Sequence, residues 1–237
     1  MRAAILWRHF HNCPMDNAYN RSRPSARYAD LLAQYRQMHE RGTGDGKTPA
    51  EKTFDGRALF TELPRLGMLF KANGVKTVLD YGCGKARYHT EGFEAKFEAG
   101  SAKMTAKDFW GVESVSLYDP GYAPYSSLPQ GTFDAVISTD VMEHLPESDV
   151  PWVLGEIFSF ARKLVFVNVA SYPAVKTLPD GTNAHCTVQP TAWWRERLAA
   201  AAARRPGVKY VCVVDTTGLY KTKDPFSGRV DEEIIEG

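Results

Sequence analysis

The stretch of sequence that decides the fold is Val78-Leu79-Asp80-Tyr81-Gly82-Cys83-Gly84. A short apolar run leads into a Gly-x-Gly turn, and residues of helical character follow. Glycine lets the backbone turn tightly and approach a ligand closely, because no Cβ intrudes. The amides at the start of the following helix then face that ligand. The stretch therefore predicts a buried strand, a ligand-binding turn and a helix that continues to about Glu98.

Segments of the same kind continue toward the C-terminus, where apolar, β-branched runs alternate with helical patterns. Such alternation predicts an α/β fold with a mostly parallel sheet and helices on both faces. Its ligand site lies at the carboxyl ends of the strands. We expect strands at residues 75–81, 112–118, 133–139, 164–170 and 208–215, and helices at 150–161 and 193–204.

The first 72 residues show a different pattern. Apolar side chains recur at helical spacing over Arg27–Arg41, which predicts an amphipathic helix. A second helix is expected over Arg57–Lys71, perturbed by Pro64. We therefore expect a helical N-terminal extension, residues 1–72, packed on a domain of residues 73–237. The extension either covers the ligand or only packs on the domain.

Composition limits the classes of partner. Lys and Arg number 29 against 28 Asp and Glu, so the net charge is +1, and the strongly basic face that favours nucleic acid is not indicated. The four cysteines are widely spaced without a CxxC pair, which is typical of a reducing compartment. Residues 3–7 are too short for a signal-peptide core, and no apolar run is long enough to span a membrane. We expect a cytoplasmic protein; the sequence does not indicate its oligomeric state.

Two residues of the turn region bear on the kind of ligand. The dinucleotide fingerprint needs a third glycine at position 87, where this chain has Arg87. Asp80 precedes the glycines, and its carboxylate would repel a diphosphate but attract an ammonium or sulfonium group. A nicotinamide or flavin oxidoreductase is therefore disfavoured.

Three motifs in order carry a family resemblance. Asp80-Tyr-Gly-Cys-Gly84 resembles motif I (D-x-G-x-G) of the class I S-adenosylmethionine-dependent methyltransferases. Asp119 ends the second strand, like the family carboxylate that binds the ribose hydroxyls. Residues 133–146, Phe-Asp-Ala-Val-Ile-Ser-Thr-Asp-Val-Met-Glu-His-Leu-Pro, resemble the family's fourth strand and its "EHL" loop. Over most of its length the chain also resembles uncharacterised bacterial and phage methyltransferase-like proteins.

The resemblance implies a Rossmann-like class I methyltransferase sheet that binds S-adenosyl-L-methionine. The turn 82–84 would lie along the methionine and ribose, Asp119 would bind the ribose, and Asp80 would act near the amino-acid end. The cofactor-binding residues implied are Asp80, Gly82, Cys83, Gly84, Asp119 and Asp140.

One segment departs from the family pattern. Only thirteen residues separate Asp119 from Phe133, too few for a helix, a strand and another helix. An extended segment of that length spans about 40 Å, enough to pass over one neighbouring strand. We therefore predict a reduced third-strand region. The family's adenine contacts come from that region, and the candidates to replace them are Tyr122, Tyr125 and Leu128.

The candidate catalytic residues are His144, Glu143 and His185, in the loops after the predicted strands. Methyl transfer needs in-line placement, and a base only when the acceptor is not already nucleophilic. Three interpretations stay open: a general base, structural support for the cofactor loop, or a metal site that includes Asp140. Small-RNA 2′-O-methyltransferases and some quinone-biosynthesis O-methyltransferases carry a similar carboxylate-x-x-Glu-His arrangement with a divalent cation. Our prediction assigns no metal.

The expected function is S-adenosylmethionine-dependent O- or N-methylation of an unidentified small molecule or glycan. The alternatives are a metal-dependent RNA 2′-O-methyltransferase and a non-catalytic module that binds S-adenosylmethionine. One residue of the pair Trp193 and Trp194 is expected in the core, and the other is a candidate for the acceptor site together with Tyr172.

Overall fold

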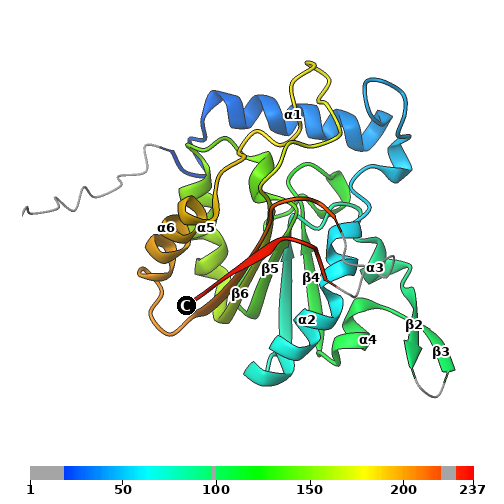
Figure 1. The fold of residues 1–237 in the computed structure, drawn as a ribbon, viewed down its shortest axis with the longest axis vertical. Helices are drawn as coiled ribbons and strands as arrows, with labels where there is room; N and C mark the ends of the chain where they lie inside the picture. Colours follow the sequence, from blue (N-terminus) through cyan, green and yellow to red (C-terminus); the bar gives the residue numbers. More distant parts are fainter. Residues whose placement is uncertain (1–18, 98–99, 220–227) are drawn as a thin grey trace, which may run out of the picture.

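The computed structural model describes residues 19–97, 100–219 and 228–237. Its centre is a six-stranded sheet with the strand order β4-β1-β5-β6-β7-β8 (Figure 1). All neighbouring strands are parallel except β7 and β8, which are antiparallel. The prediction of an α/β fold with a mostly parallel sheet is confirmed. The strands are β1 (Thr77–Tyr81), β4 (Ser114–Tyr118), β5 (Phe133–Thr139), β6 (Ala161–Ala170), β7 (Lys209–Asp215) and β8 (Glu232–Glu236).

The order of the strands places a crevice beside β1. The chain passes from β1 to β4 on one side, and then crosses back over β1 to β5 on the other. The crossing segment, residues 119–132, contains only the 3-10 turn η2 (Ala123–Tyr125). Among the described residues no strand pairs with the outer edge of β4. Ligands of open α/β sheets bind where the strand order reverses in this way.

Helices cover both faces of the sheet, as predicted. α5 (Val150–Phe160) and α6 (Thr191–Ala202) pack on one face, and α2 (Arg57–Asn73) and α4 (Ala106–Trp110) on the other (Figure 1). β5 lies between the two layers and is buried along its whole length. α2 runs as one helix through Pro64. Its apolar face joins the same core as β1, which fixes the position of the turn that follows that strand.

The helix predicted to reach Glu98 is wrong. After a single turn, α3 (Arg87–Thr90), the chain forms an antiparallel hairpin of β2 (Phe93–Phe97) and β3 (Gly100–Met104). Gly92 has a positive φ of 76°, and a Cβ there would lie 2.6 Å from the carbonyl oxygen of Met104. Phe93 and Ala95 are buried whereas Glu94 is exposed, the period-two alternation of a strand. Tertiary packing of Phe93 against α2 and α4 overrides helical propensity.

The helix α1 (Ala26–Arg41) lies across the carboxyl ends of the strands (Figure 1). Ser25 caps it by accepting from the amide of Tyr28, and Gly42 ends it with a φ of 85°. Arg27 and Gln34 both bond to Asp180 in the loop after β6, at 2.9 Å. α1 therefore closes over the end of the sheet where ligands bind. The 3-10 turns η1 (Ala50–Lys52) and η3 (Met142–His144) flank this region.

Some predictions fall partly outside the described residues. Residues 3–7 and Cys13 lie there, whereas Cys83, Cys186 and Cys212 are free thiols. The division of the chain at residue 72 stays a prediction. None of the helices in the described part of the chain combines the length and apolar character of a membrane-spanning segment.

Candidate functional site

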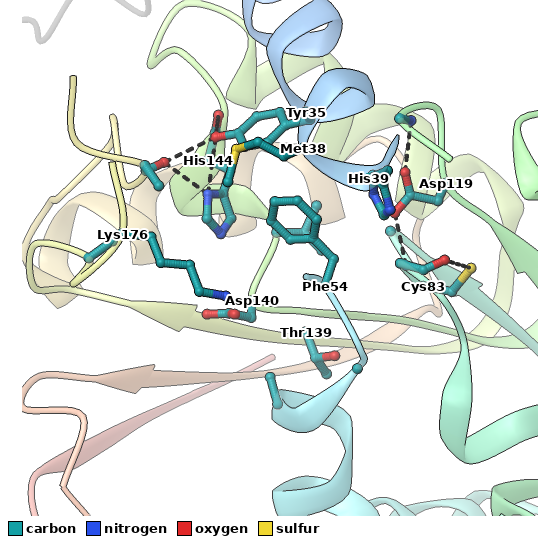
Figure 2. A pocket seen from close by; sticks show the side chains of 18 of the residues that line it. Tyr35, Met38, His39, Phe54, Cys83, Asp119, Thr139, Asp140, His144 and Lys176 are labelled. Atoms are coloured by element: carbon teal, nitrogen blue, oxygen red, sulfur yellow. Dashed lines mark hydrogen bonds between the residues drawn. The ribbon is translucent and has the colours of Figure 1, made fainter. Parts of the chain in front are cut away.

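A cavity of about 770 Å³ lies at the carboxyl ends of β1, β4 and β5, beneath α1 (Figure 2). This volume falls within the roughly 300–1,000 Å³ range of small-molecule sites. The parallel sheet brings strand ends that are far apart in sequence to one edge. Every residue of the predicted cofactor set lines the cavity, namely Asp80, Gly82, Cys83, Gly84, Asp119 and Asp140.

Both glycines of the turn are required by conformation and by close packing. Gly82 has a φ of 87°, and a Cβ there would lie 2.4 Å from a methyl group of Val141. Gly84 has a φ of 55°, and its Cβ would lie 2.3 Å from the carbonyl oxygen of Phe54. Only glycine adopts such backbone angles without strain. The turn is therefore held between the loop after β5 and the loop before α2.

The amides of the turn are already bonded within the protein. Those of residues 82 and 83 donate to the carbonyl of Tyr118, at 2.7 and 3.1 Å, and that of residue 84 donates to Asp119 Oδ2 at 2.8 Å. The amide of residue 85 donates to the carbonyl of Phe54, and that of residue 86 donates back to the turn, both at 2.9 Å. The expectation concerned the amides at the start of the following helix, and the bonds of residues 82–86 do not test it. A phosphate needs free N–H groups, and this turn supplies none.

Asp119 is held by two backbone amides. Its Oδ2 accepts from Gly84 and its Oδ1 from Gly121, each at 2.8 Å. Burial raises the pKa of the Asp119 carboxyl, and the two amides oppose that shift. Each oxygen retains a lone pair beyond the one that it gives to an amide. The carboxylate is thus fixed in orientation and able to accept from hydroxyl groups in the cavity.

Asp80 is 2% exposed and pairs within the protein. Its Oδ2 lies 2.9 Å from Nε2 of His89 in α3, and its Oδ1 is buried without a hydrogen-bond partner. Because a carboxylate only accepts, the His89 nitrogen is the donor. Sequence reasoning missed His89, because its position inside an expected helix gave no sign of this contact.

Three side chains converge on the other side of the cavity. The ligating atoms of Asp140, His144 and His185 lie within 4.8 Å of one another. Nδ1 of His144 lies 2.8 Å from the carbonyl of Ala184, and Nδ1 of His185 lies 2.6 Å from the carbonyl of Tyr172. A carbonyl only accepts, so each Nδ1 carries a proton, and in the neutral form of either ring the lone pair is on Nε2.

The protonation of this group follows from burial. Burial lowers the pKa of His144 to about 4, against the opposing effect of the Asp140 charge. At neutral pH this imidazole is therefore uncharged, and its conjugate acid is too strong for an efficient general base. Asp140 has a φ of 59°, a left-handed backbone that costs a non-glycine residue about 1 kcal/mol. His144 therefore offers a lone pair rather than a proton.

The predicted catalytic residue Glu143 lies behind this group. It is fully buried, and its Oε1 accepts from the amide of Ala170 at 2.6 Å. Burial, followed by the charge of Asp140, raises the pKa of the Glu143 carboxyl well above its usual value. Glu143 is not among the residues that line the cavity. Its contact joins the loop after β5 to the end of β6.

Sequence reasoning missed four cavity residues that come from distant segments, Tyr35, His39, Phe54 and Lys176 (Figure 2). The Tyr35 hydroxyl donates to the carbonyl of Ala184 at 3.0 Å and lies 3.1 Å from Nδ1 of His144. The apolar stripe of α1 predicted packing, but it did not reveal this polar contact.

The proposed replacements for the adenine contacts lie elsewhere. Tyr122, Tyr125 and Leu128 are absent from the cavity lining, although Tyr122 stacks on the ring of His39, which lines it. Trp194 is fully buried in the core, as expected for one of the pair. The cavity lining includes Tyr172 and neither tryptophan.

A scan against protein-family models, a search of the curated proteins and a search of the solved structures each find no match to this chain. The assignment of a function therefore rests on the fold and on the chemistry of the cavity.

Proposed function

We propose that this chain is an S-adenosylmethionine-dependent methyltransferase that acts on a small-molecule or glycan acceptor. One observation carries the proposal. Three carboxylates, Asp80, Asp119 and Asp140, come from the ends of three neighbouring strands and line one cavity whose glycine turn has no free amide. The strand-end wall of the cavity therefore favours positive charge and hydroxyl groups, whereas Lys52, Arg57, Arg87 and Lys176 lie elsewhere in its lining.

The carboxylates at the strand ends suit a sulfonium nucleoside. S-adenosylmethionine supplies an electrophilic methyl group together with an ammonium group and a ribose diol. Asp119 is oriented by the amides of Gly84 and Gly121, so its two oxygens are positioned to accept from vicinal hydroxyls. Asp80, buried beside His89, adds negative charge beneath the turn. The same features weigh against a dinucleotide, whose diphosphate would meet carboxylates.

Cys83 acts in this proposal only as a packing residue. Its thiol is buried, and burial raises its pKa well above the usual value. A thiol of this kind is a poor nucleophile. The chain then needs to place an acceptor in line with the methyl group, which is the main requirement of methyl transfer.

Calorimetry tests the cofactor assignment. The full chain is titrated with S-adenosylmethionine, with S-adenosylhomocysteine and with NAD, and only the first two are expected to bind. Asp119→Ala removes two hydrogen bonds to a charged group and is expected to weaken binding by about 10- to 1,000-fold. Asp108→Ala, which removes an exposed carboxylate outside the cavity, is the matched control.

Two results would contradict the proposal. One is the absence of binding by either nucleoside to folded protein, and the other is an unchanged affinity in Asp119→Ala. Transfer of a labelled methyl group to components of a metabolite extract then separates an enzyme from a module that only binds. A His144→Ala variant serves as the control for that transfer.

A further inference from the structure

We propose that Asp140, His144 and His185 form a binding site for one divalent metal ion of the Mn²⁺, Co²⁺ or Zn²⁺ type. Their ligating atoms lie within 4.8 Å of one another. Ligands at about 2.1 Å from a shared tetrahedral ion lie about 3.4 Å apart, so the three ligating atoms need to close by at most about 1.4 Å. The half-exposed His185 and the exposed Asp140 have room for that movement.

The hydrogen bonds of the two histidines are those that metal ligation requires. A ligating imidazole binds the ion through one nitrogen and donates its other N–H to a carbonyl or carboxylate, which fixes the tautomer. His144 donates to Ala184 O at 2.8 Å, and His185 donates to Tyr172 O at 2.6 Å. Both acceptors are backbone atoms, so neither can rotate away. Two separate loops thus bring imidazoles, each held through its Nδ1, to the same carboxylate.

The position of Asp140 adds to this argument. It directly follows β5 in a left-handed conformation, with φ at 59°. Its amide donates to the carbonyl of Asn168 at 3.0 Å, which holds the backbone in place. Strained backbone of this kind persists only where surrounding contacts impose it, and it concentrates at functional sites.

The composition of the donor set indicates the class of ion. Two imidazoles and one carboxylate suit the borderline ions Mn²⁺, Fe²⁺, Co²⁺ and Zn²⁺ better than Mg²⁺ or Ca²⁺, which prefer oxygen. Three protein ligands leave coordination positions open toward the cavity. There an acceptor oxygen would bind. This last step rests on the proposed function, whereas the cation site does not.

Lys176 offers a competing explanation of the same carboxylate. Its side chain is exposed and extends into the cavity toward Asp140 (Figure 2). It also lies over the ring of Phe54, with Nζ 5.7 Å from the ring centroid. Because backbone carbonyls hold the Nδ1 atoms of both histidines, their hydrogen bonds are the same in either explanation. The two explanations predict opposite results with metal.

The test is a metal titration of the full chain without a histidine tag, stripped with a chelator and free of any nucleoside. Calorimetry with Co²⁺, Mn²⁺, Zn²⁺ and Mg²⁺ is expected to show one equivalent of a borderline ion bound, with Mg²⁺ weaker. Co²⁺ additionally reports nitrogen ligation through its visible absorption. Because no nucleoside is present, the result is independent of the cofactor proposal.

Variants locate the site. Asp140→Asn and His185→Gln are each expected to weaken binding about 100-fold or more, beyond the 10- to 100-fold typical of losing an outer contact. His39→Gln removes a histidine of the same cavity whose Nδ1 is taken by Lys85, and it is expected to bind as the native chain does. Both test positions are at least partly exposed, so the variants are expected to fold. No saturable binding, or equal binding by His185→Gln, would overturn the proposal.

Discussion

The glycine-turn half of the cavity (residues 80–86 and Asp119) and its histidine half (Asp140, His144 and His185) differ in where their polar groups point. In the glycine-turn half, every amide from residue 82 to 86 donates to a protein acceptor, and Asp119 accepts two of the protein's amides. In the histidine half, Nδ1 of each imidazole donates to a backbone carbonyl, and the ligating atoms of the two rings and of Asp140 lie within 4.8 Å of one another.

The difference indicates that the glycine-turn half binds a ligand rigidly, whereas the histidine half holds the reactive groups. The amides of the glycine-turn half are bonded before binding and need no reorganisation, so this half is prepared for a ligand of fixed shape. Ligating atoms that converge in this way suit a shared cation, the ligand proposed above for the histidine half. The following predictions test whether the two halves behave in these different ways.

The largest expected effect is in the glycine-turn half. Gly84→Ala places a Cβ 2.3 Å from the Phe54 carbonyl oxygen at a φ of 55°, so strain and overlap combine. We expect the free energy of unfolding to fall by about 2–4 kcal/mol, measured by urea denaturation. The cavity should also lose its affinity for the nucleoside.

A matched control separates overlap from backbone strain. Gly74 has nearly the same φ, 57°, but a Cβ there meets nothing within 4 Å. Gly74→Ala should therefore cost only about 1 kcal/mol, the conformational part alone. Equal losses in the two variants would show that the contact with Phe54 does not constrain the turn.

An intermediate effect is expected where α1 meets the histidine half. Tyr35→Phe removes a hydroxyl that donates to Ala184 O at 3.0 Å and lies 3.1 Å from Nδ1 of His144. We expect a loss of about 1 kcal/mol in the free energy of unfolding. Metal affinity should fall by about tenfold in the titration described above, because the outer support of one imidazole is weakened. Nucleoside binding should stay unchanged, and a loss there instead would contradict the division into two halves.

The smallest effect concerns pH and His39, which lies between the halves. Its Nδ1 is 3.1 Å from Nζ of Lys85, and burial, followed by the Lys85 charge, lowers the pKa of His39 to about 3. The unfolded chain, with a pKa near 6.5, therefore takes up this proton first as pH falls. The stability contributed by neutral His39 is present above pH 6.5 and is lost between about pH 6.5 and 3.

Linkage gives the size of that change. Between pH 7.5 and 6 this histidine should account for about 0.8 kcal/mol of lost stability. His39→Gln keeps an acceptor for Lys85 but does not titrate. Between pH 7.5 and 6 the free energy of unfolding of this variant should therefore fall by about 0.8 kcal/mol less than that of the native chain. Denaturant unfolding of both proteins at the two pH values measures the difference. Identical pH dependence would show that His39 is not buried in its neutral form.

The parts of the fold that sequence predicted well are those with one dominant pattern. β5 is buried on both faces, and the apolar run Ala135–Ile137 at its centre placed the strand, Phe133–Thr139, correctly. The short segment after Asp119 fixed the crossing over β1 by chain length alone. The hairpin at residues 93–104 was missed because a helical pattern and an alternating one compete there. β8 was missed because an edge strand rich in glutamate has no apolar run.

From the sequence, the site was predictable only as a group of residues at the ends of neighbouring strands. Parallel strands bring Asp80, Asp119 and Asp140 to one edge, and sequence order is enough to see this. Which oxygen and which amide are already paired depends on tertiary contacts, such as that of Lys85 with Phe54. The contributions of α1 were hidden for the same reason, because its residues reach the cavity from a hundred positions away.

The placement of α1 has a consequence for the size of what can bind. Tyr35 reaches the histidine half and His39 reaches Lys85 beside the glycine turn, and the two are four residues apart on one helix. Four residues rise about 6 Å along a helix axis, a distance that side-chain motion does not alter. The helix α1 thus fixes the distance between the positions of Tyr35 and His39. We therefore expect the protein to discriminate among ligands by length as well as by charge.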